Sequence, residues 1–319
     1  MPEAHLQERI LELRQVPTLR AVPPRILREL AASVEIESRP AGVTLLAEGE
    51  PVASVGWVLE GRARWERAGR GLGTAELGAS IGVLEVTASI AATASARAET
   101  PMMLARVGAE RWIELLEDSC DLALGVLSSL ASELAALGRR RFGEVVAISR
   151  IEARCAHELD FTERLVRLRR SRPFARAPIR ALAVLAERSA MRVLAPGTVL
   201  WDRGREAREI AVLLDGVITE GRERFGPGDT LGLAEALASR SRDAAAVARS
   251  AVTAIAFDVE ALMDVLEDDE ELTLELVREH AGELLASGIA RGLPPDVLGG
   301  APDRSLPRAV RRSPLDTAG

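Results

Sequence analysis

The sequence predicts a mixed α+β fold in which one unit occurs twice, each copy a small jelly-roll-like β-roll flanked by helices. Two observations predict this fold. Glycines recur at constant offsets along the chain, and apolar residues at helical spacing precede and follow each glycine-rich stretch. A chain of 319 residues that is 47% hydrophobic is long enough for two domains with separate cores.

The internal repeat appears at two offsets. Three glycines recur 155 positions later, and a Gly-Gly-Glu set recurs 150 positions later. The first set is Gly42, Gly49 and Gly61, repeated as Gly197, Gly204 and Gly216; the second is Gly78, Gly82 and Glu85, repeated as Gly228, Gly232 and Glu235. One deletion of five residues between Gly216 and Gly228 explains the change of offset. We infer that the chain arose by duplication.

Within each copy, turn residues separate the expected elements. Residues 8–33 have helical spacing, and the short segments 43–47, 55–59 and 63–66 between glycines predict antiparallel strands. The acid-Gly pairs Glu60-Gly61 and Asp215-Gly216 predict hairpin turns. Last strands end near residues 107 and 257, and helices are expected at 109–137 and 259–287.

These elements predict four parts of the chain. Residues 138–165 have nearly helical apolar spacing, which fits either a dimerisation helix or a solvated interdomain helix. The last part has five prolines and no apolar period, so we expect disorder there. The parts are a first domain at 8–137, a helical connector at 138–165, a second domain at 166–287 and a disordered tail at 288–319.

Composition argues against several classes of function. All 41 basic residues are arginine, which a GC-rich, bacterial genome explains, and the net charge of −7 argues against a nucleic-acid partner. Residues 122–137, the most apolar stretch, contain three serines and a glutamate and fall short of a membrane span. Two cysteines make neither a disulfide framework nor a metal site. With no secretory signal visible, we expect a cytoplasmic protein.

The stretch from Gly226 to Ala248 is the best candidate for a binding site. It reads as a Gly/Pro turn, a glycine, one helical turn, and then an arginine among small residues. Backbone N–H groups at the start of a helix lack intrahelical partners and carry partial positive charge. An arginine can complete such a cradle, so this order of residues can hold an anion.

This stretch resembles the phosphate-binding cassette of cyclic-nucleotide-binding domains, which reads Phe-Gly-Glu-(Leu/Ile)-Ala-Leu and then Pro-Arg-Ala-Ala. Gly232 and Arg242 match at the family's spacing. The resemblance covers roughly residues 13–137 and 168–287, and implies two tandem cyclic-nucleotide-binding-like β-rolls. In the second copy it implies a candidate ligand site made of Gly232, Leu233, Ala234, Glu235, Arg242, Asp243 and Ala244.

Both copies depart from the family's pattern. In the second copy Leu233 replaces the glutamate that holds the ribose hydroxyl; losing one charge-assisted hydrogen bond weakens binding roughly ten- to over a hundred-fold. In the first copy the arginine position is Ala92, and Val83 stands at the glutamate position. We expect the first site to be degenerate and structural; its residues are Gly82, Val83, Glu85 and Ala92.

Two residues of the second copy allow alternative interpretations. Arg242 is either the anion-binding cation or an ordinary surface arginine in an arginine-rich chain. Glu235 stands where the family usually has alanine. It is either an exposed first-turn glutamate that caps its helix, or an internal substitute for the ligand phosphate that pairs with Arg242.

No catalytic constellation is visible, because none of the three histidines lies near a serine or cysteine nucleophile pattern. We therefore expect a non-enzymatic regulatory or adaptor protein with an unidentified protein partner. No cofactor is expected, apart from a cyclic nucleotide or another anionic small molecule as a weak ligand of the second domain. The alternatives are a genuine cyclic-nucleotide sensor and a protein scaffold without small ligand. A homodimer through the helix after the roll is a further option, whereas a transcription factor is disfavoured by the missing helix-turn-helix.

Overall fold

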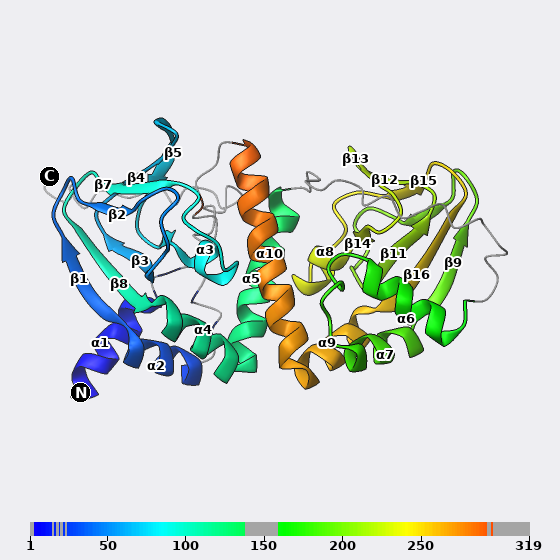
Figure 1. The fold of residues 1–319 in the computed structure, drawn as a ribbon, viewed down its shortest axis with the longest axis horizontal. Coiled ribbons are helices and arrows are strands. Elements are labelled where there is room, and N and C mark those ends of the chain that lie inside the picture. Colours follow the sequence, from blue (N-terminus) through cyan, green and yellow to red (C-terminus); the bar gives the residue numbers. More distant parts are fainter. Residues whose placement is uncertain are drawn as a thin grey trace, which may run out of the picture.

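A computed structural model describes residues 3–14, 16, 19, 22, 24–137, 159–291 and 295. It contains two similar halves, which we call repeat 1 and repeat 2, on either side of a central pair of long helices (Figure 1). The mixed α+β prediction with two β-rolls flanked by helices is confirmed.

Repeat 1 begins with two helices, continues through eight strands interrupted by one helical turn, and ends with two helices. Pro24 is the first residue of its second helix, a position where the missing N–H costs nothing. In chain order the elements are α1 (Glu3–Leu13), α2 (Pro24–Ser33), β1 (Glu35–Arg39), β2 (Thr44–Leu46), β3 (Ser54–Glu60), β4 (Ala63–Arg67), β5 (Arg70–Ala75), β6 (Ser80–Ile81), α3 (Val83–Thr87), β7 (Ser95–Ala98), β8 (Met102–Gly108), α4 (Ala109–Asp118) and α5 (Cys120–Leu137).

Repeat 2 follows the same order. Its first helix starts with a capping box: the side chain of Asp160 accepts from the backbone N–H of Glu163, and the Glu163 carboxylate accepts from the N–H of Asp160. The elements are α6 (Phe161–Arg170), α7 (Ile179–Glu187), β9 (Ala190–Leu194), β10 (Val199–Trp201), β11 (Glu209–Asp215), β12 (Ile218–Glu220), β13 (Glu223–Phe225), β14 (Thr230–Leu231), α8 (Leu233–Leu237), β15 (Ala246–Ala248), β16 (Val252–Asp258), α9 (Val259–Asp268) and α10 (Glu270–Arg291).

Each roll consists of two four-stranded sheets with matching topology. Repeat 1 has the orders β1-β8-β3-β6 and β2-β7-β4-β5, and repeat 2 has β9-β16-β11-β14 and β10-β15-β12-β13. All pairs between named strands are antiparallel. No sheet formed by the described residues mixes strands of the two repeats, so each roll closes on itself.

The predicted hairpins at the acid-Gly pairs are wrong. Gly61 and Gly216 do form tight turns with φ of 86° and 85°. However, the strands on either side lie in different sheets, β3 pairing with β6 and β8, and β4 with β5 and β7. These turns carry the chain from one sheet to the other. A Cβ at Gly216 would come within 2.8 Å of the Val252 backbone, so the close approach of the two sheets also requires glycine there.

The deletion inferred from the sequence shortens one hairpin. In repeat 1 the β4–β5 hairpin runs from Ala63 to Ala75, which pair with each other. The equivalent β12–β13 hairpin runs from Ile218 to Phe225, again a pair, and is five residues shorter. The missing residues come from the outer end of the hairpin, where shortening leaves the rest of the sheet in register.

The two repeats exchange their long helices. Helix α5, which ends repeat 1, packs along α10 and against α8 of repeat 2. Helix α10, which ends repeat 2, packs in turn against α3 of repeat 1 (Figure 1). Each roll encloses a small core between its sheets, whereas one larger core spans both repeats; we call it the helical core, because helix residues predominate in it and residues of β3, β8, β11 and β16 complete it. The short helix in each cassette is therefore covered by the other repeat.

Two helices cross the expected domain boundaries, which stay predictions. Helix α6 begins at Phe161, inside the range 138–165 assigned to the connector, and packs on α7 of repeat 2. Helix α10 continues past residue 287 to Arg291. Pro295, within the expected tail, is buried. Residues 138–158 and most of the tail lie outside the described residues, so the connector helix and the disorder stay predictions.

Helix α5 is, by length and composition alone, apolar enough to cross a membrane, the single such helix among the described residues. This differs from the expectation for residues 122–137, because the helix begins earlier, at Cys120. In the fold its apolar side chains have protein partners: Leu122, Leu127 and Leu130 are almost fully buried in the helical core. The packing accounts for its composition without a membrane.

Candidate functional site

The cassettes of both repeats have nearly the same backbone. A short strand ends at a glycine in the left-handed conformation, and a five-residue helix follows. The glycines are Gly82, with φ of 75°, and Gly232, with φ of 76°. Side chains other than glycine rarely adopt this conformation, so the sequence places glycine where the chain must turn into the helix.

Arg242 lies inside the second cassette and is almost fully buried. Its Nη2 donates to the backbone carbonyl of Glu209, and its guanidinium carbon lies 3.8 Å from the centre of the Trp201 ring. The indole of Trp201 is itself fixed by a 2.9 Å hydrogen bond to Glu220. The interpretation of Arg242 as a surface arginine is therefore wrong.

The carboxylate that balances Arg242 comes from the same cassette. Arg242 Nη1 lies 3.8 Å from Glu235 Oε2, and the Glu235 side chain is 14% exposed. The interpretation of Glu235 as an exposed helix cap is therefore wrong, and its pairing with Arg242 is present. Because an isolated charge is costly to bury, each group makes the burial of the other tolerable.

Arg242 also occupies the space above the cassette glycine. A Cβ at Gly232 would come within 2.8 Å of Arg242 Cζ. In repeat 1 the corresponding Cβ at Gly82 would come within 2.7 Å of Val52 Cγ1. A guanidinium fills this space in one repeat and an isopropyl group in the other.

In the first cassette a buried, hydrogen-bonded glutamate takes the place of the ion pair. Ala92 stands at the arginine position and is buried. Glu85 is fully buried, and its Oε1 accepts a 2.7 Å hydrogen bond from Thr93 Oγ1 and a longer one from the Thr93 backbone. Burial raises the pKa of the Glu85 carboxyl, and the hydrogen bonds from Thr93 offset this only in part.

The remaining predicted residues of the second site do not converge on Arg242. Leu233 and Ala234 are buried in the helical core. Leu233 stands where the family has the carboxylate that binds the ribose, so both this side chain and its surroundings are apolar. Asp243 is 65% exposed and lies 4.0 Å from Arg240. Ala244 is half-buried. Only Gly232, Glu235 and Arg242 come together. Val83, in the first cassette, is also in the helical core.

Three partners were not predicted from the sequence. Trp201 and Glu209 hold Arg242 from strands β10 and β11, and Thr93 holds Glu85. A signal for the tryptophan existed in the repeat register, because the residue 155 positions before Trp201 is Leu46, which lies in the repeat with no cassette arginine. The Glu209 contact uses a backbone carbonyl, for which side-chain identity gives no signal. Within the described ranges no group of three or more His, Cys, Asp or Glu could hold a metal ion.

Comparison with known proteins agrees with the resemblance for repeat 2. Residues 191–269 match the family model of the cyclic nucleotide-binding domain, from β9 to the end of α9. Repeat 2 is therefore a cyclic-nucleotide-binding-like domain. No curated protein matches the sequence.

Solved structures similar to the chain include two kinase regulatory proteins and a putative cyclic nucleotide binding protein. The regulatory domain of Toxoplasma gondii PKA with cAMP is 12% identical, with 89% of this chain and 98% of that chain covered and a TM-score of 0.36. The regulatory subunit of a cAMP-independent protein kinase A from Trypanosoma cruzi, bound to guanosine, is 14% identical over 91% and 94%, with a TM-score of 0.37. A putative cyclic nucleotide binding protein from Ruegeria pomeroyi is 18% identical over 40% and 62%, with a TM-score of 0.36.

Proposed function

We propose that the chain is a non-enzymatic regulatory or adaptor protein in which neither cyclic-nucleotide-binding-like site depends on a nucleotide. The observation that carries this proposal is the buried pair of Arg242 and Glu235. In a ligand-free anion site the arginine would face solvent or an empty pocket. Here its charge is matched by a carboxylate of the same cassette, so the protein supplies the anion itself.

The surroundings of the pair support the same proposal. A nucleotide phosphate would have to displace Glu235, lose the energy of a partly buried ion pair, and find the apolar Leu233 where a ribose partner is needed. In repeat 1 Ala92 stands at the arginine position, and the buried Glu85 accepts a hydrogen bond from Thr93. The second site is thus at most a weak or altered site for an anionic ligand.

One observation favours a sensor as the second candidate function. Helix α5 of repeat 1 packs on α8, the helix that carries Glu235. An anion that displaced the Glu235 carboxylate would act directly on a helix in contact with the other repeat. An anion that binds the displaced state more tightly would then shift the packing of α5.

Replacing Glu235 tests the proposal directly. Glu235→Ala leaves Arg242 buried without its carboxylate, so the variant should melt below the wild type. Inorganic phosphate, cyclic AMP or cyclic GMP should then raise its melting temperature by mass action, because each can take the vacated place. The wild type should give no shift with either cyclic nucleotide at millimolar concentration.

The control is Glu235→Ala combined with Arg242→Ala, which should not respond to any of the three anions. Micromolar binding of a cyclic nucleotide to the wild type by calorimetry would support the sensor instead. A folded Glu235→Ala protein that ignores all three anions would contradict self-occupation of the site.

A further inference from the structure

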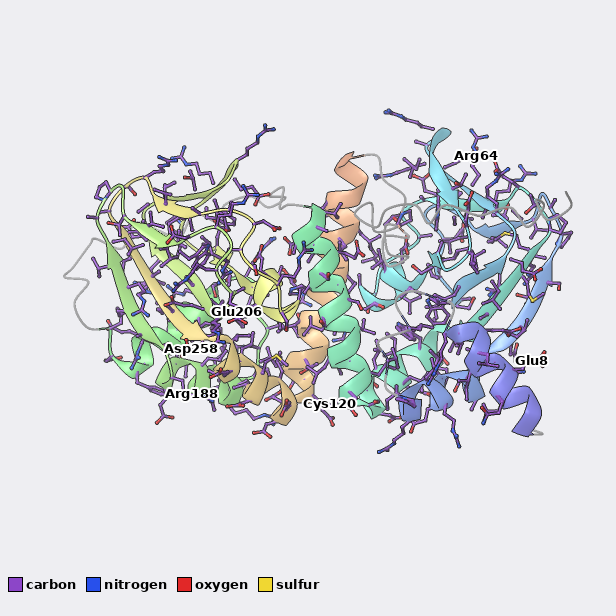
Figure 2. All side chains as sticks on the ribbon, turned by 180° about the vertical axis from the view of Figure 1, so that it is seen from behind. Glu8, Arg64, Cys120, Arg188, Glu206 and Asp258 are labelled. Carbon is purple, nitrogen blue, oxygen red and sulfur yellow. The ribbon has the colours of Figure 1, made fainter. Side chains whose placement is uncertain are left out.

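A cavity of about 380 Å³ lies between the two repeats, beside the second cassette, whose Arg242 and Glu235 do not line it. Its walls come from α5 of repeat 1 and from α8, α9 and the segment before β11 of repeat 2. Figure 2 shows Glu206, one of its lining residues, on the side of repeat 2 that faces the helix pair. The volume falls within the range of small-molecule sites, roughly 300 to 1,000 Å³. The lining residues that the argument uses are Leu127, Ser128, Glu206, Arg208, Arg240 and Met263.

The cavity combines apolar walls with charged groups. Leucines of α5 and α8, Val259 and Met263 supply the apolar part. Arg208 is bound to Glu206 at 2.7 Å, so this pair is neutral. Arg240 Nη1 reaches α5, where it lies 3.4 Å from the Ser132 carbonyl.

Arg240 is the group most available to a ligand anion. Its ion-pair partner Asp243 is 4.0 Å away and 65% exposed, and an exposed pair of this kind contributes about 0 to 1 kcal/mol. Glu133 of α5 is a second neighbouring carboxylate; burial raises its pKa, and the charge of Arg240 lowers it in part. The remaining charged lining residue, Glu260, disfavours a second negative charge in the cavity. These groups therefore suit a molecule with a compact apolar body and a single anionic group.

Repeat 1 has an equivalent cavity that differs in chemistry. It measures about 670 Å³, and its lining includes Val52, Ile90 and Ile113, at the positions of Ala207, Arg240 and Met263. Ile90 is 45% exposed. The lining of this cavity contains no arginine and no residue of the opposite repeat's long helix. Compared with repeat 1, the cavity of repeat 2 therefore adds Arg240, the Glu206–Arg208 pair and the helix of the other repeat.

We propose that the cavity between α5 and repeat 2 is a binding site for a small amphipathic monoanion, with the apolar body against α5, α8 and α9 and the anionic group on Arg240. The site shares α8 and Arg240 with the cassette but is separate from the Arg242 site, because neither Arg242 nor Trp201 lines the cavity. A molecule bound there contacts both repeats and favours their packed arrangement. This inference does not depend on whether the cassette binds a nucleotide.

Octanoate is a suitable probe, and Met263 is a suitable reporter. The chain has five methionines, of which Met263 lines this cavity and the equivalent one contains none. In the full chain labelled with ¹³C-methyl methionine, octanoate should shift the Met263 methyl resonance saturably, with Met263→Leu giving the assignment. The melting temperature should rise in parallel.

Matched variants separate this site from unspecific binding of a fatty acid. Arg240→Ile introduces the residue type that repeat 1 has at this place, and should weaken octanoate about tenfold or more, because it removes a charge-assisted hydrogen bond. Binding of the neutral probe 1-octanol should change by less than about twofold in that variant. Ser128→Trp fills the cavity from an exposed position and should abolish binding of both probes, whereas Ile90→Trp in the equivalent cavity should not affect octanoate.

Several outcomes would overturn the proposal. These are no saturable Met263 shift up to about 10 mM octanoate, equal affinity of the wild type and Arg240→Ile, or loss of octanoate binding in Ile90→Trp alone. Circular dichroism and the melting temperature of each variant without probe show whether it is folded. Cyclic AMP serves as the control ligand, and it should shift the Met263 resonance in neither the wild type nor the Arg240→Ile protein.

Discussion

The two cassettes share one backbone but balance charge in different ways. In repeat 2 the buried Arg242 is matched by Glu235, while in repeat 1 the buried Glu85 has no ion-pair partner among the described residues and accepts a hydrogen bond from Thr93. The glutamates occupy the same position of the repeat, 150 residues apart. A buried glutamate at this position is therefore accommodated in two ways. In repeat 2 it forms an ion pair, and in repeat 1 it accepts a hydrogen bond from a hydroxyl while burial raises its pKa.

The difference extends to the residues underneath. The arginine requires a flat aromatic surface and a backbone acceptor, which Trp201 and the Glu209 carbonyl supply. The first cassette has Ala92 at the arginine position, and Val52 lies over Gly82. Each cassette is thus a consistent set of side chains, so single exchanges between the repeats should be poorly tolerated.

The largest effect is expected from Arg242→Ala. The change removes one member of a buried pair, the contact with Trp201 and the hydrogen bond to Glu209, so we expect a loss of about 3 to 5 kcal/mol of unfolding free energy. Urea denaturation followed by circular dichroism measures it. The exposed Arg222→Ala is the control and should stay within about 0.5 kcal/mol. A loss below about 1 kcal/mol would show that the pair adds little.

Replacing both members of the pair sharpens the comparison. Glu235→Leu together with Arg242→Met turns the second cassette into an apolar one, as repeat 1 is at the arginine position. Buried ion pairs replaced by well-packed apolar residues are often neutral in stability, so the double variant should lie within about 1 kcal/mol of the wild type. Thermal and urea unfolding provide the measurement. If instead the double variant is as unstable as Arg242→Ala, the packing on Trp201 rather than charge balance holds this site.

An effect smaller than that of Arg242→Ala is expected from Thr93→Val in repeat 1. Valine keeps the shape of threonine but removes the hydroxyl that donates to Glu85, which is fully buried. A buried polar group left without this donor costs about 1 to 3 kcal/mol. At the equivalent position of repeat 2, the exposed Asp243→Asn should change stability by less than about 0.5 kcal/mol. Equal effects at the two positions would mean that the hydrogen bond from the Thr93 hydroxyl to Glu85 adds little to stability.

Most of the fold could be predicted because glycines at constant offsets reveal the repeat. The turns at Gly61 and Gly216 and the cassette turns at Gly82 and Gly232 require a left-handed backbone, and this requirement is visible in a single sequence. The pairing partner of each strand could not be predicted. The acid-Gly pairs looked like hairpins because a tight turn inside a sheet and one between two sheets use the same residues.

The candidate site was predicted in its charges but not in its surroundings. Arg242 and Glu235 share one cassette, so their proximity follows from local spacing. The contacts from Trp201 and Glu209 depend on strands that lie more than thirty positions earlier in the chain, and the exchange of α5 and α10 depends on how two domains pack. Helical spacing shows that a helix has an apolar face but does not show which domain covers it.

The smallest effect on stability is expected from replacing each glutamate by glutamine and measuring unfolding at several pH values. Burial raises the pKa of Glu85 above its ordinary value of 4.5. Between the unfolded and folded pKa values the folded protein therefore binds more protons than the unfolded chain. The stability that Glu85 contributes is present below pH 4.5 and is lost as pH rises through the folded pKa.

Glu85→Gln imitates the protonated carboxyl and keeps an acceptor for Thr93. The variant should be more stable than the wild type at pH 7, and the difference should shrink as pH falls towards 4.5, because the wild type then takes up its proton. The same exchange in repeat 2, Glu235→Gln, should have the opposite sign at pH 7, since it removes the charge that balances Arg242. Urea unfolding of both variants from pH 4.5 to 8 provides the measurement. If both variants are more stable than the wild type at pH 7, or both are less stable, then the glutamates contribute to stability in the same way in the two cassettes.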